Sequence, residues 1–374
     1  MSVTRTLVVG GTGPSGPLVV EGLLARGHDV VILHSGRHEV EFSQPVEHIH
    51  ADPNFREPLV EALGAKTFDL AVCLYGRLRV VADVLRGRTE RLIGVGGVFY
   101  PGWVDGRVLS RSAVEAPPPV YTKSSPRVSE DVPLEVTGSF SERAVETERL
   151  LMEWHHRGEF VATMMRYPML YGPRQLAPVE WSVVRRVLDG RRTLLVPDGG
   201  LLLETRLFNG NAARALLGAV DHPVEAAGQA FNCGDPDPIT LRDWALTIAE
   251  ALDHELELVS VPFDLADQAY AYARGPWNVC HRVLDIDHAR GLIGYEPIPT
   301  RVALRTTARW YAEHALERGG EEEIQLGDPF AYDAEDAFVD RLHALRDELA
   351  GGGAARSYRH PYAHPPLPAA TAAD

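Results

Sequence analysis

A glycine triplet near the N-terminus constrains the fold of this chain most. Gly10, Gly13 and Gly16 stand at GxxGxxG spacing in VVGGTGPSGPLVVEGLLARGHDVVIL, between a strand-like run and a helix-like run that leads to a second strand. Glycine lets the backbone turn sharply there, and the N-terminus of the following helix offers N–H groups and a positive dipole end to an anion. The segment therefore predicts a strand, helix and strand unit that seats a dinucleotide pyrophosphate.

Strand-like and helix-like segments alternate through the first half of the chain. Strands separated by helices at this spacing form a parallel sheet covered on both faces. The sequence therefore predicts an α/β fold, a Rossmann-type doubly wound parallel sheet with a smaller C-terminal α/β substrate lobe. The predicted strands are 7–10, 30–33, 70–74, 91–95 and 161–167, and the predicted helices are about 15–26, 53–64, 79–86 and 141–157.

The chain is expected to divide into three parts. Residues 1–175 form the predicted NAD(P)-binding domain, to which a later segment at about 204–235 returns, and residues 176–318 form the substrate-binding lobe. Residues 319–374 form a helical and irregular C-terminal extension. It contains one predicted helix at 332–350, which the run GGG ends, and a Pro-rich tail.

Charge and cysteine content limit the partners and the location. A formal net charge of −15 and a pI near 5.5 repel phosphate backbones and anionic membrane surfaces. The three cysteines are widely spaced and form no CxxC pair, and no run approaches the ~18 apolar residues of a membrane span. We therefore expect a cytoplasmic protein with a small-molecule substrate and without a nucleic acid or membrane partner. A homodimer stays open.

Four motifs occur in order along the chain: the loop GGTGPSG, Asp52 after the third strand, which contains His48 and His50, RYPMLYGP (166–173) and DIDHARGLIGYEPI (285–298). As a set they resemble an extended short-chain dehydrogenase/reductase of the NAD-dependent epimerase/dehydratase type, over about residues 5–315. The resemblance implies that Asp52 contacts the adenine and that residues 167–172 line the nicotinamide side. The predicted cofactor-binding residues are Gly10, Gly13, Pro14, Ser15, Gly16, His34, Ser35, Arg37, Asp52, Tyr167 and Pro168.

The end of the second strand bears on the choice between NAD and NADP. An acidic residue there holds the ribose hydroxyls of NAD, whereas an arginine accommodates the 2′-phosphate of NADP. The chain reads ILHSGRHE, with no acid at the strand end and with His34, Ser35 and Arg37 as donors. We predict NADP, and NAD stays open.

The catalytic residues of the family pattern are absent. Family members use a tyrosine and a lysine four residues later on one helix face, with a serine or threonine at the end of a preceding strand. Matching FSERAVETE to that pattern places Phe140 at the tyrosine and Ala144 at the lysine, and the strand end carries Gly96 and Gly97. Neither lysine of the chain stands four residues after a tyrosine, so the motif YxxxK occurs nowhere.

Other side chains could replace the absent set. Tyr100 is favoured as a relocated general acid because it follows the strand end where substrate oxygens sit. Tyr121 and His281 complete the predicted catalytic residues, the second because histidine exchanges protons near neutral pH. Further candidates are Lys123, Glu142, Arg143, Glu204, Arg206 and Trp277.

The segment HIHAD is a candidate metal site. Its residues His48, His50 and Asp52 alternate along a strand and so share one face. However, the segment leads into the adenine contact by resemblance, and no further ligand cluster stands beside it in the sequence. We therefore expect no metal there, and none at HPYAHP in the tail.

Three functions are compatible with these residues. The first is an NAD(P)-dependent oxidoreductase or epimerase that acts on a small polar metabolite with a non-standard acid/base set. The second is a non-redox isomerase, lyase or cyclase that keeps the cofactor as a structural part or a recycled hydride carrier. The third is a non-catalytic nucleotide-binding protein, and the acidic net charge opposes an RNA-binding version of it.

Overall fold

The computed structural model describes residues 3–74, 76–100, 103, 127–134, 139–262, 265 and 281–351. Tyr121, Lys123 and Trp277, three of the candidate residues, lie outside this set. The chain divides into two compact units, Met1–Pro329 and Phe330–Asp374, which are described separately. No helix among the described residues is both long enough and apolar enough to cross a membrane.

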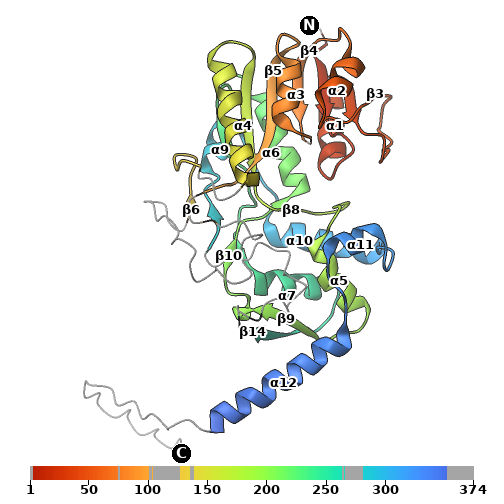
Figure 1. The fold of residues 1–374 in the computed structure, drawn as a ribbon, viewed down its shortest axis with the longest axis vertical. Coiled ribbons are helices and arrows are strands. Elements are labelled where there is room, and N and C mark those ends of the chain that lie inside the picture. Colours follow the sequence, from red (N-terminus) through yellow and green to blue (C-terminus); the bar gives the residue numbers. More distant parts are fainter. Residues whose placement is uncertain are drawn as a thin grey trace, which may run out of the picture. The chain divides into compact units, whose positions relative to one another are not determined.

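A seven-stranded parallel sheet forms the centre of the first unit, in the order β12-β7-β5-β4-β1-β2-β3 (Figure 1). This arrangement confirms the predicted doubly wound fold. Between β1 and β4 the strand order reverses direction, so the carboxyl ends of the central strands border a crevice there. The strands are β1 (Arg5–Val9), β2 (Asp29–His34), β3 (Glu47–His50), β4 (Phe68–Cys73), β5 (Thr89–Gly97), β7 (Val161–Tyr167) and β12 (Ala230–Asn232).

Helices cover both faces of this sheet because its strands are apolar on both sides. Val8 of β1 joins a core beneath α1 (Gly16–Leu24), α6 (Asn209–Asp221) and α9 (Asp287–Ile293). Its neighbours Leu7 and Val9 join the opposite core, beneath α2 (Arg56–Leu63), α3 (Leu78–Leu85) and α4 (Ser139–His156). Successive strand residues point to opposite faces, so near-continuous apolar runs are what a sheet buried on both sides requires.

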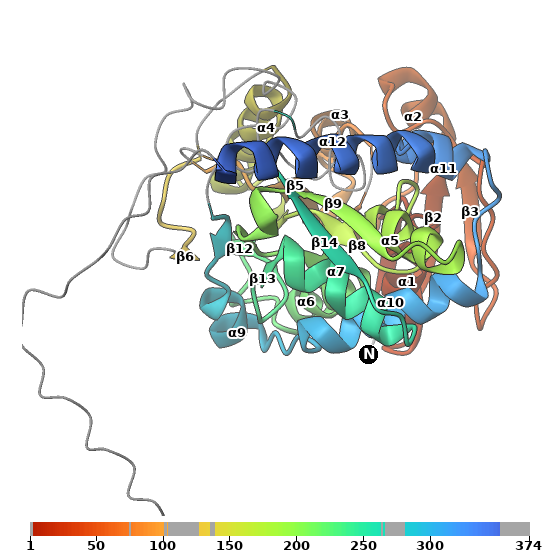
Figure 2. The same ribbon diagram turned by 90° about the horizontal axis from the view of Figure 1, so that it is seen from below.

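The lobe beyond the sheet is built around three mutually packed helices, α5 (Val179–Leu188), α7 (Leu241–Ala251) and α10 (Thr300–Glu313) (Figure 2). Beside them β9 (Thr193–Pro197) pairs in parallel with β14 (Glu257–Val261). Short strand pairs complete this region: β10 (Leu203–Glu204) with β13 (Ile239–Thr240), β11 (Leu207–Phe208) with β8 (Leu170–Tyr171), and β15 (Val283–Leu284) with β6 (Arg127–Val128). The 3₁₀ turn Asp198–Gly200 follows β9.

The boundary of the C-terminal part differs from the one expected at residue 319. Helix α11 (Glu321–Leu326) belongs to the first unit, where the Trp181 indole N–H donates to Glu323 Oε1 at 2.8 Å. The predicted helix at 332–350 is present as α12 (Tyr332–Gly351) in the second unit. The region after residue 319 therefore contains two helices instead of the single predicted one, because the acidic stretch that begins at Glu321 forms a short helix.

Candidate functional site

A cleft of about 1010 Å³ lies at the carboxyl ends of the central strands. Its walls come from the segments that directly follow β1, β2, β3, β4 and β7 and from the end of β5. This is the edge at which open α/β sheets bind ligands. The structure brings all eleven predicted cofactor residues together around it: Gly10, Gly13, Pro14, Ser15, Gly16, His34, Ser35, Arg37, Asp52, Tyr167 and Pro168. Their binding of a cofactor stays a prediction.

The three glycines of the motif between β1 and α1 differ in how strictly the fold requires them. Gly10 adopts φ +87°, a left-handed conformation that favours glycine. A Cβ on Gly16 would overlap the backbone of Gly11, so only glycine allows this approach of the helix start to the loop. A Cβ on Gly13 would meet only the Gly10 carbonyl oxygen, at 3.4 Å. The fold thus needs Gly10 and Gly16, whereas Gly13 leaves room on the cleft side.

Asn209, at the start of α6, holds two walls of the cleft together. Its Nδ2 donates to the Pro14 carbonyl at 3.1 Å and to the Pro173 carbonyl at 2.9 Å. Gly172 has φ +127°, and a side chain there would collide with the Asn209 amide. One amide from a distant helix therefore fixes both the glycine loop and the turn after β8.

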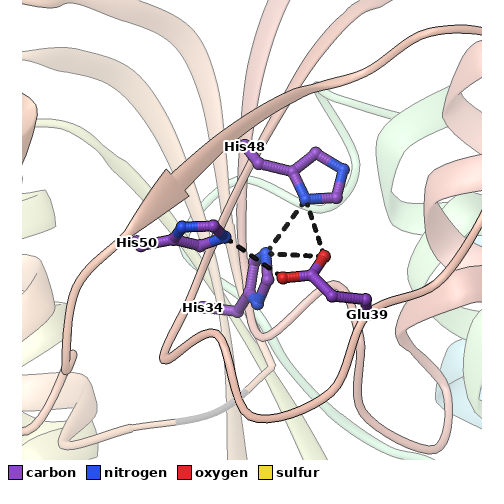
Figure 3. Close-up of side chains that lie close together, drawn as sticks. All are labelled: His34, Glu39, His48 and His50. Atoms are coloured by element: carbon purple, nitrogen blue, oxygen red, sulfur yellow. Dashed lines mark hydrogen bonds and ion pairs between the residues drawn. The ribbon is translucent and has the colours of Figure 1, made fainter.

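The end of β2 carries more charge than its sequence indicates. His34 is buried, its Nδ1 accepts from the Gly36 N–H at 3.2 Å, and burial lowers the pKa of this imidazole. Glu39, five residues farther on, lies in the loop that returns to β3, and its carboxylate contacts His48 and His50 (Figure 3). Glu39 and Glu41 both line the cleft. The NADP prediction assumed that no acidic residue lies at the end of β2. This is true of the linear sequence, but in the folded protein Glu39 and Glu41 line the same cleft as that strand end.

Asp52 lines the cleft beyond β3, as expected for an adenine contact. Its Oδ1 also accepts from the backbone N–H of Asn54 at 2.9 Å and from the Asn54 Nδ2 at 2.8 Å. This is an Asx turn, which fixes the backbone after the strand. The same carboxylate can therefore serve the turn and face a bound base.

Apolar and backbone groups form the wall after β5 and β7. Leu74, Val95, Gly96 and Leu170 line it together with Tyr167 and Pro168. The Tyr167 hydroxyl points into the protein, donates to the Ala212 carbonyl at 2.9 Å, and burial raises the pKa of this phenol well above its usual range. Tyr167 thus presents its ring to the cleft and no available proton.

The position of the absent strand-end hydroxyl is filled by an aromatic ring. A Cβ on Gly97 would lie 2.8 Å from the Phe99 ring, so Phe99 fills the space of a strand-end hydroxyl. Ala144 is half-buried on α4, and no described residue of that helix lines the cleft. The side chain of Phe140 lies outside the described set. Restoring a hydroxyl at residue 97 would therefore require Phe99 to move.

Tyr100, the favoured catalytic candidate, is buried in a polar network and does not line the cleft. Its hydroxyl donates to Asn232 Oδ1 at 2.6 Å and accepts from Arg166 at 2.9 Å. Arg166 in turn forms a buried ion pair with Glu148 of α4, at 2.5 Å. Burial raises the pKa of Tyr100 to about 12, although Arg166 opposes the shift. A catalytic role for Tyr100 stays a prediction, and these contacts favour a structural one.

The other described candidates lie away from the cleft. His281 is exposed, and its Nδ1 accepts from the Leu203 N–H at 2.9 Å. Glu204 and Arg206 pair at 3.0 Å, with the Arg206 guanidinium 4.1 Å from the Trp244 ring centroid. None of these three candidates lines the cleft. The structure therefore unites the predicted cofactor residues but not the predicted catalytic ones.

The cleft also contains residues that sequence reasoning missed. The loop after β2 contributes several of them, and a run of charged residues next to a nucleotide strand could have indicated these. Trp310 of α10 and Glu322 of α11 have no such signal, since their place depends on how the lobe folds back. The missed lining residues are Thr12, His38, Glu39, Val40, Glu41, Asn54, Leu74, Val95, Gly96, Arg174, Gln175, Leu176, Trp310 and Glu322.

No protein-family model matches the chain, but curated proteins do. The 3-diazoavenalumate denitrifying reductase of a Streptomyces species is 27% identical over 314 residues, which cover 78% of this chain and 96% of that protein. UDP-glucose 4-epimerase of Mycolicibacterium smegmatis is 27% identical over 326 residues, which cover 78% of this chain and 93% of that protein. The similarity thus extends through almost the whole length of both relatives.

Solved structures share the fold. The UDP-glucose 4-epimerase of Thermus thermophilus in complex with NAD has a TM-score of 0.64 at 19% identity, covering 83% of this chain and 100% of that chain. RMD from Pseudomonas aeruginosa complexed with NADPH has a TM-score of 0.62 at 15% identity, covering 84% and 99%. Neighbours with this sheet therefore hold NAD in one case and NADPH in another. These relatives and structural neighbours are members of the NAD-dependent epimerase/dehydratase family of extended short-chain dehydrogenase/reductases, the family that the sequence motifs resemble.

Proposed function

We propose that this chain binds NADP in the cleft and transfers hydride between the nicotinamide and a small polar metabolite, as an oxidoreductase or epimerase. The observation that carries the proposal is the convergence of all eleven predicted cofactor residues on one cleft at the carboxyl edge of the sheet. Relatives that act on UDP-glucose make sugar nucleotides the first substrate class to test.

The acid/base chemistry of the proposed enzyme is non-standard. Tyr167 keeps its hydroxyl turned inward, and the Phe99 ring occupies the space beside Gly97. Proton transfer at this wall then depends on water, on substrate groups or on side chains outside the described set, among them Tyr121 and Lys123. The bound cofactor supplies the hydride chemistry, while these residues of the chain shape an apolar wall for it.

A non-redox isomerase, lyase or cyclase with a recycled cofactor is the second candidate function. It is favoured by the Phe99 ring, which fills the space beside Gly97 where the family pattern has a hydroxyl, and by the absence of the motif YxxxK from the sequence. In that case the nicotinamide returns to its starting oxidation state within each turnover.

One experiment separates the candidates. The protein is titrated with NADPH and NADH by nicotinamide fluorescence, and its complex with NADP⁺ is then mixed with a panel of UDP-sugars, whose hydroxyl groups can donate hydride. The absorbance of reduced nicotinamide and the sugar products are followed. We expect saturable NADPH binding and a substrate-dependent rise in that absorbance. Sugar turnover without net absorbance change would favour an epimerase or another reaction with a recycled cofactor, and absence of binding for both dinucleotides would contradict the proposal.

Arg37 is expected to contribute to the preference for NADP. It lines the cleft beside Ser35, where a 2′-phosphate would extend. A hydrogen bond to a charged group contributes about 1.5–3 kcal/mol, so Arg37→Ala should reduce the ratio of NADPH to NADH affinity about tenfold or more. Calorimetric titration of both cofactors measures the ratio. Arg79→Ala, on an exposed helical arginine away from the cleft, is the matched control. Equal affinities in the parent protein would refute the preference.

A further inference from the structure

We propose that His34, Glu39, His48 and His50 form a binding site for one divalent transition-metal ion of the zinc class. The four side chains point toward one another beside the cleft, at the outer edge of the sheet (Figure 3). His34 and Glu39 also line the dinucleotide cleft, but the ion would bind the four side chains without a cofactor, and the sequence alone led us to expect no metal here.

The pairing of two strands creates the cluster. In the parallel register of β2 and β3, His34 stands opposite His50 and Ile32 stands opposite His48. His48 and His50 are two residues apart on β3, so both side chains leave the same face of the sheet. Glu39 reaches that face from the loop between the strands. Strand register thus brings the three imidazoles together, and the loop between the strands adds the carboxylate.

The ligand atoms lie close enough together to converge on one ion. Ligand atoms about 2.0–2.1 Å from a zinc ion lie roughly 3.3–3.4 Å from one another. The His48 Nδ1 is 3.1 Å from the His34 Nε2 and 3.3 Å from the Glu39 Oε2, and the His50 Nε2 is 3.3 Å from the Glu39 Oε1. The His34 Nε2 and the Glu39 Oε2 are 3.9 Å apart, and all four ligand atoms lie within 4.8 Å of one another, so a bound ion would draw them closer together.

The donor set selects the class of ion. Imidazole nitrogen suits zinc, copper, nickel and cobalt, whereas magnesium and calcium prefer sites made of oxygen alone. Four protein ligands also complete a tetrahedral shell, which is the arrangement of structural zinc sites and leaves no open position for catalysis. The ion would therefore fasten the loop that carries Glu39 to the edge strand β3.

A hydrogen-bonded cluster without an ion is the competing interpretation. The Gly36 N–H donates to the His34 Nδ1, which puts the ring proton on Nε2 in that state. Metal binding needs the Nε2 lone pair, so it moves the ring proton to Nδ1 and ends the Gly36 contact. Gly36 has φ +78° and carries no side chain, so its peptide can reorient. The two interpretations thus predict different behaviour toward added metal.

A metal titration without cofactor tests the site. The full chain is treated with a chelator, dialysed, and titrated with Co²⁺ by visible absorbance and with Zn²⁺ by calorimetry. We expect one equivalent of Co²⁺ per chain with the intense absorption bands of tetrahedral coordination, which Zn²⁺ then displaces. Failure to observe these bands would overturn the proposal, while cofactor binding, measured separately, would be unaffected by that failure.

Exposed ligands provide the variants, because removing them leaves the core intact. Side chains of His50 and Glu39 are 58% and 57% exposed. Loss of an outer-shell partner already costs 10–100-fold in metal affinity, so His50→Ala and Glu39→Gln should each weaken binding by at least that factor. His38→Ala, an exposed histidine of the same loop outside the cluster, is the control and should bind like the parent. Unchanged binding in both ligand variants would place the metal elsewhere and refute the site.

Discussion

Replacing Gly13 with valine is expected to abolish dinucleotide binding while the protein remains folded. Gly13 sits at the turn into α1, and an added Cβ would meet only the Gly10 carbonyl oxygen within the protein, at 3.4 Å. The larger side chain would therefore fill the cleft, where the pyrophosphate approaches the helix N-terminus. Losing two charge-assisted hydrogen bonds costs roughly 3–6 kcal/mol, a decrease in affinity of about 100-fold or more.

Calorimetry with NADPH measures this loss, and circular dichroism checks that the fold persists. Gly291→Val is the matched control, since an added side chain there meets nothing within 4 Å and the residue does not line the cleft. Gly16→Val should behave differently from both, because its Cβ would overlap the Gly11 backbone and destabilise the fold itself. A Gly13→Val protein that bound NADPH like the parent would show that the glycine loop is not the cofactor site.

Removing the buried guanidinium of Arg166 should cause a large loss of stability. Arg166 pairs with Glu148 through three contacts of 2.5–3.2 Å, and the two side chains are 8% and 11% exposed. Arg166→Met leaves the Glu148 carboxylate buried without its partner, which typically costs about 3–5 kcal/mol. We expect the melting midpoint, followed by circular dichroism, to fall by ~5 °C or more.

Two further variants test the origin of this effect. Arg157→Met removes an exposed ion pair with Glu153, which should cost less than about 1 kcal/mol. Tyr100→Phe removes one hydroxyl from the same buried network and should cost about 1–3 kcal/mol. If Tyr100 is instead a general acid, Tyr100→Phe should lower the turnover of each folded molecule by about 10²–10⁴. Parent-like melting of Arg166→Met would contradict the buried ion pair.

The convergence of the candidate cofactor residues on one cleft could be predicted from the sequence because its signals are local. Gly10, Gly13 and Gly16 each act within one turn, and the apolar runs that specify β1 and β2 are continuous in the chain. In a parallel sheet, residues that follow successive strands must meet at one edge. Knowing the strands was therefore enough to bring His34 and Asp52 to the same cleft.

The catalytic side could not be predicted because its contacts are distant in sequence. Tyr100 was correctly located after β5, but the direction of its side chain depends on Arg166 and on Asn232, which is 132 residues away. The proposed metal site beside β3 could not be predicted for a similar reason. His48 and His50 share a face by simple alternation, whereas the approach of Glu39 depends on the path of a loop that has no regular pattern.

The edge strand β12 joins the sheet late during synthesis of the protein, because it lies far along the chain from its neighbour β7. The residues of β7 emerge from the ribosome well before Asn232 of β12, with the chain of α5 and β9 made in between. Until α6 has been synthesised, it cannot pack against the apolar face of α1 that includes Val20 and Leu23. At ~5–20 residues per second this interval lasts on the order of several seconds. The nascent nucleotide fold therefore passes through an incomplete stage with an unpaired strand edge, during which chaperone binding or aggregation competes with completion of the sheet.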